Sequence, residues 1–74
     1  MIVIDDSRSK VIYCRTNRRI KWKYAEYCGR WESIADCIKS AKEHYGDQGF
    51  EYMIEDLATD EVMTGFVNWE RRQV

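Results

Sequence analysis

The clearest secondary-structure signal in this chain is SIADCIKSAKEHYG, residues 33–46. Its apolar side chains recur three or four positions apart, which places them on one stripe of an α-helix. These positions are Ile34, Cys37, Ile38, Ala41 and Tyr45. Ser33 can cap the first turn, and Gly46 can adopt the left-handed conformation that ends a helix. We therefore expect one helix of about three turns from Ser33 to Tyr45.

Before this helix the apolar period changes to two, which is typical of a half-buried strand. Residues 11–14 and residues 19–24 both alternate in this way. A turn at residues 17–18 would join them as an antiparallel hairpin in which Tyr13 faces Trp22. The sequence thus predicts two strands ahead of the helix.

After the helix, a third alternating segment begins at Phe50, and a polar turn at residues 56–60 leads into a last strand at residues 61–69. That last strand is apolar on both faces. One face carries Val62 and Phe66, and the other carries Met63, Val67 and Trp69. Because apolar residues on both faces indicate burial on both sides, we expect this strand to be covered twice.

The predicted order is strand, strand, helix, strand, strand, which indicates an α+β fold. We expect a small antiparallel sheet of four strands with one helix packed across one face. Residues 1–4 are a candidate fifth strand, and residues 70–74 are expected to fray. A chain of 74 residues supports only one core, so residues 1–74 are predicted to form a single compact domain.

The cysteines indicate a reducing compartment. Cys14, Cys28 and Cys37 are odd in number and lack a C-x-x-C spacing, which argues against a disulfide framework and a zinc knuckle. We expect a cytoplasmic protein. No apolar run approaches the roughly 18 residues that span a bilayer, so no membrane contact is expected.

Charge is divided along the chain. Residues 8–30 carry eight basic side chains against one acid, and residues 32–61 carry nine acids against two bases. The candidate site for a partner or an anion is a basic segment, which comprises Arg15, Arg18, Arg19, Lys21, Lys23 and Arg30. Interleaved basic and aromatic residues suit phosphate contacts and base stacking. In the favoured interpretation, Glu51 and Glu55 instead neutralise this face through cross-strand pairs. In a third interpretation, the face binds an acidic protein partner.

Catalytic and metal-binding motifs are not evident in the sequence. His44 is the only histidine, and Cys37 lies two helical turns away, about 10.5 Å along the axis, which is too far for one shared ion. A nucleophile would need a neighbouring base and an orienting group, and no motif supplies them. We expect neither an enzyme nor a cofactor or metal site.

The segment GFVNW at residues 65–69 partly resembles the ribonucleoprotein octamer of RNA-recognition motifs. Gly65, Phe66, Val67 and Trp69 fit that motif, whereas residues 62–64 depart from it. The resemblance implies an RNA-binding fold with a second helix, for which the predicted element order leaves no place. A chance similarity in an apolar strand is the preferred interpretation.

These observations favour a small non-catalytic protein-interaction module. In size and style it is similar to the inhibitors or accessory proteins of phages and other mobile elements. The predicted docking or dimer face comprises Met63, Val67 and Trp69, and a homodimer is one form that the interaction would take. The alternative is nucleic-acid or anionic-ligand binding through residues 8–30.

Overall fold

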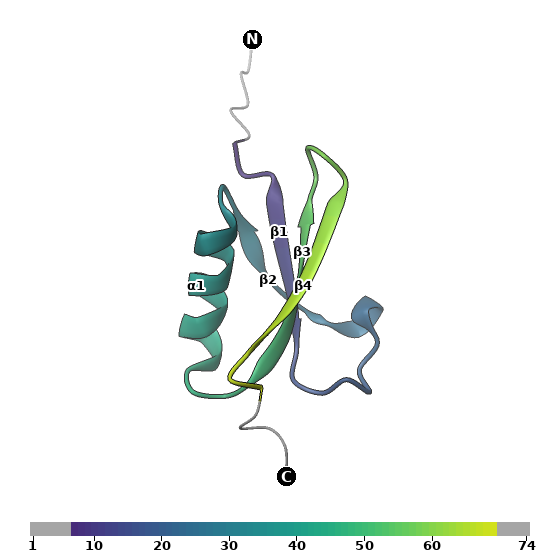
Figure 1. Ribbon diagram of the computed structural model, residues 1–74, viewed down its shortest axis with the longest axis vertical. Helices are drawn as coiled ribbons and strands as arrows, with labels where there is room; N and C mark the ends of the chain where they lie inside the picture. The colour runs from purple at the N-terminus through teal and green to yellow at the C-terminus, as the bar shows by residue number, and fades with distance from the viewer. Residues whose placement is uncertain (1–6, 70–74) are drawn as a thin grey trace.

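The computed structural model describes residues 7–69, so the candidate strand at residues 1–4 and the tail at residues 70–74 lie outside the described residues. The elements are β1 (Lys10–Arg15), a 3-10 helix η1 (Trp22–Tyr24), β2 (Glu26–Trp31), α1 (Ile34–Tyr45), β3 (Phe50–Asp56) and β4 (Glu61–Val67). The four strands form one antiparallel sheet in the order β2-β1-β3-β4. Helix α1 packs across one face of this sheet (Figure 1). The predicted α+β fold is confirmed.

Helix α1 begins and ends where the sequence indicates. The Ser33 hydroxyl accepts a hydrogen bond from the Asp36 amide at 3.1 Å, and Gly46 has the positive φ of 62° expected of a C-terminal glycine. The helix buries Cys37 and Ala41 against the sheet.

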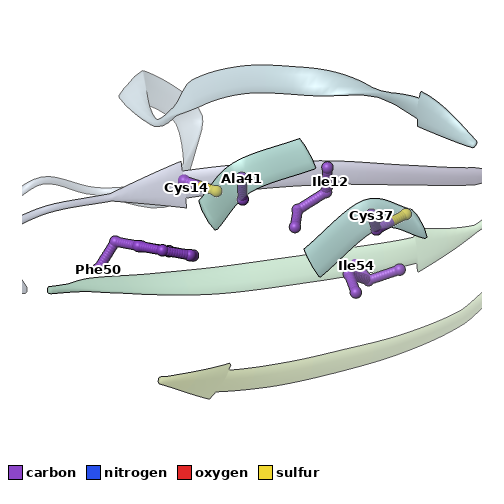
Figure 2. Packing of buried hydrophobic residues seen from close by; sticks show 6 residues of the cluster. All are labelled: Ile12, Cys14, Cys37, Ala41, Phe50 and Ile54. Atoms are coloured by element: carbon purple, nitrogen blue, oxygen red, sulfur yellow. The ribbon is translucent and has the colours of Figure 1, made fainter. Parts of the chain in front are cut away.

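The core lies between α1 and the two central strands (Figure 2). Its buried members are Ile12 and Cys14 from β1, Cys37 and Ala41 from α1, and Phe50 and Ile54 from β3. Tyr45 closes one end by stacking on Phe50, with ring centroids 4.8 Å apart. Complete burial of a side chain such as Phe50 stabilises the fold by about 1.5–3 kcal/mol.

The second strand is displaced from its predicted position. Residues 19–24 lie in an extended loop that contains η1, and β2 begins only at Glu26. The loop folds back on the end of β1 because Arg15 holds it there. The Arg15 guanidinium donates to the Ile20 carbonyl at 2.6 Å and lies 4.1 Å from the centre of the Trp22 ring.

The predicted pairing of Tyr13 with Trp22 is therefore wrong. Tyr13 instead lies opposite Tyr27 of β2, and the two rings make an edge contact with centroids 5.9 Å apart. The β1–β2 ladder also shifts register between Val11 and Tyr13, where Gly29 of β2 has a φ of 122°. This β-bulge is a feature that strict alternation in the sequence cannot reveal.

The prediction that β4 is covered on both faces is also wrong. Helix α1 packs mainly on β2 and β1, with a smaller contact to β3, and lies toward the β2 side of the sheet (Figure 1). A helix about 10 Å wide covers only two or so strands spaced about 4.8 Å apart. Met63, which lies on the same face as α1, consequently remains 38% exposed. Val62 and Phe66 lie on the opposite face and are 54% and 50% exposed.

Candidate functional site

Strand β4 is the edge of the sheet that lies away from the helix. Its ladder with β3 runs without a register shift from the pair Phe50 and Val67 to the pair Asp56 and Glu61. Edge strands are usually protected against pairing with another chain by a lysine, a proline or a bulge. Strand β4 has none of these, and Glu61 at its start is its only charged residue.

The register assigns the residues of β4 to two faces. Val62 and Phe66 lie opposite Glu55 and Glu51 on the face away from α1, which we call the open face. Met63 lies opposite Ile54 and shares the helix-covered face with the core. Strand β4 thus presents exposed apolar side chains on both faces of the sheet, together with an edge available for strand pairing.

The predicted docking residues do not all share one environment. Met63 is exposed, whereas Val67 is half-buried and packs on the core. Trp69 is half-buried and was expected on the Met63 face, but its ring lies 5.0 Å from that of Phe66. Asn68 has a φ of 51°, which redirects the chain after β4.

Val62 and Phe66 are therefore candidate site residues that the sequence analysis did not select. Their alternation within residues 61–67 is visible in the sequence. What could not be read there is that the face of β4 away from α1 stays exposed, with Val62 at 54% and Phe66 at 50%.

Gly65 gives β4 a further specific feature. The Tyr52 side chain of β3 crosses over Gly65 so closely that a Cβ on this glycine would lie 2.3 Å from the Tyr52 hydroxyl oxygen. A tyrosine from the neighbouring strand thus covers the space that a side chain at position 65 would fill. On the face of the sheet that carries α1, an aromatic group therefore lies close to the β4 edge.

A small cleft adjoins the first residues of β4. It has a volume of about 90 Å³ and lies between the start of α1 and the β3–β4 turn, where Ile34 and Met63 are among its lining residues. An ion pair between Lys10 and Asp56, at 3.2 Å, forms part of its lining. Ligand pockets usually measure about 300–1,000 Å³, so this cleft suits a single inserted side chain better than a cofactor.

The predicted basic segment separates into three parts. Arg18, Arg19, Lys21 and Lys23 are exposed on residues 16–25, which we call the basic loop. Tyr24 on the same loop is 71% exposed, and the Lys23 ammonium lies 5.1 Å from the centre of its ring. This loop extends from one end of the sheet (Figure 1).

Arg15 and Arg30 lie on strands β1 and β2 rather than on the basic loop. The Arg15 Nε donates to Glu51 Oε1 at 2.7 Å, and only 11% and 8% of the two side chains are exposed. Glu51 thus neutralises Arg15 of the basic segment through a cross-strand pair, whereas its expected pairing with Lys21 or Lys23 is not observed. Arg30 lies on β2, where its Nε donates to the Arg8 carbonyl.

A polar cluster joins β2 to the end of α1. Glu26 accepts a hydrogen bond from the Tyr45 hydroxyl at 2.6 Å and contacts His44 Nε2 at 3.0 Å. The Tyr45 hydroxyl is the main cause that lowers the pKa of Glu26, and His44 adds to it. These bonds fix the helix to the β2 edge of the sheet.

Two cysteines lie beside this cluster. The interaction between their side chains lowers the pKa of Cys28 to about 7, while the same interaction and burial raise the pKa of Cys14. His44 contacts Glu26 rather than either sulfur. Within residues 7–69, no group of three or more His, Cys, Asp or Glu side chains is placed to hold a metal ion.

Comparisons with known proteins give no independent assignment. No protein-family model matches this chain, and neither a curated protein nor a solved structure matches it. Among the described residues, no helix has the length and apolar character needed to cross a membrane. Evidence on function therefore comes from the surfaces of the molecule.

Proposed function

We propose that this chain is a protein-interaction module that binds its partner through β4. The observation that carries the proposal is an unprotected edge strand with exposed apolar side chains on both faces. An edge of this kind can add a strand from another chain, because its outward backbone groups provide hydrogen bonds and its side chains provide apolar contacts. Val62, Met63 and Phe66 would supply those contacts.

The proposed role is binding without catalysis, in the manner of an inhibitor or accessory protein of a phage or mobile element. The small cleft beside Met63 supports this role, since it admits a side chain from a protein partner. A cytoplasmic setting is part of the proposal, and the free thiols of Cys14, Cys28 and Cys37 support it.

Affinity capture with matched variants tests the use of β4. Phe66→Glu places a charge on the exposed open face, and Tyr24→Glu makes the same kind of change on the basic loop. We expect a partner to bind the wild type and Tyr24→Glu but to be lost with Phe66→Glu. The partner would then be purified and its affinity measured directly. Equal affinity for both variants would contradict docking through β4.

A second candidate function is supported by the basic loop. Arg18, Arg19, Lys21 and Lys23 are exposed beside Tyr24, which is the combination that contacts phosphates and stacks on single-stranded bases. This function predicts oligonucleotide binding that weakens steeply with salt. Replacing Lys21 and Lys23 by Glu should abolish it, whereas Phe66→Glu should leave it unchanged. Oligonucleotide binding that is unchanged by the lysine replacements would exclude the basic loop as the binding site.

A further inference from the structure

We propose that the partner that occupies β4 is a second copy of this chain, paired antiparallel through its own β4 about a two-fold axis at Thr64. This inference rests on the proposed use of β4 for protein binding and specifies its occupant. The two four-stranded sheets then join into one continuous sheet of eight strands, and each copy contributes the same edge, as a two-fold interface requires.

The sequence of β4 is complementary to itself in this register. Full overlap of residues 61–67 with the same residues of the second copy places Val62 opposite Phe66, and Phe66 opposite Val62. Each is a pair of an aromatic and a β-branched side chain on the open face, a combination that stabilises antiparallel strands. Both residues are about half exposed in the single chain, so pairing removes apolar surface from water.

The centre of the register is also complementary. Thr64 lies opposite Thr64 of the second copy, and threonine pairs are favourable between neighbouring strands. Met63 lies opposite Gly65 of the second copy. Because glycine has no side chain, the flexible thioether of Met63 needs another group to contact. The Tyr52 ring that crosses over Gly65 provides that contact, and sulfur–aromatic contacts are favourable.

Charge permits the same register. Glu61 is the only charged residue of β4, and it lies opposite Val67 of the second copy. The two copies of Glu61 are then at opposite ends of the paired strands, about 20 Å apart along the strand direction. No like charges face each other across the pair.

The other edge of the sheet is unsuited to this pairing. Strand β2 contains the bulge near Gly29, which has a φ of 122°, and it carries charges at Glu26 and Arg30. Bulges and charges on an edge oppose strand addition. Self-association through β4 therefore closes as a dimer instead of continuing into a fibre.

Mass measurement across concentration tests the pairing. We expect the 8.9 kDa chain to double its mass as its concentration rises from about 1 µM to about 1 mM in sedimentation equilibrium. Val62→Lys and Phe66→Glu should each weaken the dimer by about tenfold or more, because both cross-strand apolar pairs are lost. Leu57→Lys, an equivalent change on the exposed β3–β4 turn, should leave the dimer unchanged.

Mixing the two variants tests the register. In a mixed dimer, the lysine at position 62 of one chain faces the glutamate at position 66 of the other, and the second Val62 and Phe66 pair is retained. An equimolar mixture should therefore dimerise more tightly than either variant alone. Circular dichroism of each variant confirms that a loss of dimer is not a loss of fold.

Any one of three results would overturn the inference. A wild type that stays monomeric to about 1 mM would exclude the second copy as the occupant, while binding of another protein sensitive to Phe66→Glu would keep the proposed function. A mixture no tighter than its components, or a dimer unaffected by Val62→Lys, would exclude this register. If Phe66→Glu captured a partner as well as the wild type and Tyr24→Glu did, the proposed function itself would be excluded.

Discussion

Replacement of Arg15 by methionine should destabilise this protein strongly. Glu51 would then lie nearly buried without its partner at 2.7 Å, and removal of one member of a buried ion pair costs about 3–5 kcal/mol. Slight exposure of both side chains, 11% and 8%, places the expected cost near the lower end, at about 3 kcal/mol. The loop would also lose the contacts of Arg15 with the Ile20 carbonyl and the Trp22 ring.

That loss is large for a chain of this length. At about 0.05–0.15 kcal/mol per residue, 74 residues give a free energy of unfolding of about 4–11 kcal/mol. Urea unfolding followed by circular dichroism measures the change. With a slope of about 1 kcal/mol per M, the midpoint for Arg15→Met should fall by about 3 M. Arg19→Met, on the exposed basic loop, should shift unfolding by less than about 0.5 kcal/mol.

A double variant separates the lost ion pair from other effects. Arg15→Met combined with Glu51→Leu removes both charges, so it should be more stable than Arg15→Met alone by about 2 kcal/mol or more. If Arg15→Met costs less than about 1 kcal/mol, or if the two changes are additive, the pair does not secure the loop as described.

Three further predictions concern local features. Ser33→Ala should cost about 1 kcal/mol in urea unfolding because the N-cap is lost, and a cost near zero would contradict the cap. Gly65→Ala should cost about 1–3 kcal/mol because its Cβ displaces Tyr52, and an unchanged melting temperature would show that the tyrosine does not lie over the glycine. Iodoacetamide should modify Cys28 with a midpoint near pH 7, since its lowered pKa gives thiolate below the usual alkaline range. Cys14→Ala should move that midpoint upward, as measured by peptide mass spectrometry. An unchanged midpoint would show that the two thiols do not interact.

The elements that the sequence predicted well are those specified by local pattern. Helix α1 follows from the spacing of its apolar residues and from Ser33 and Gly46 at its ends. Strands β3 and β4 follow from alternation and from the polar turn between them. These signals lie within a few residues of each other, so no knowledge of tertiary contacts is needed.

The second strand was misplaced because its position depends on side-chain contacts that an alternating pattern does not reveal. Residues 19–24 alternate as a strand does, but Arg15 holds them in a loop through Ile20 and Trp22. Strand β2 itself contains Gly29 and a bulge, which obscure its period.

The candidate site was predicted in part. The sequence located it in the last strand and selected Met63, which is exposed. It also predicted that both faces of that strand are covered, so Val62 and Phe66 were expected to be buried. Their observed exposure, 54% and 50% on the face away from α1, identifies them as surface residues.

Amide hydrogen exchange at low and high protein concentration tests the central claim about β4 most directly. Our account predicts that raising the concentration slows exchange at the outward-facing amides of residues 61–67, because these groups acquire partners in the second copy. Exchange in β2 and in the basic loop should not change. Equal rates at both concentrations, or protection confined to β2 or the basic loop, would contradict pairing through β4.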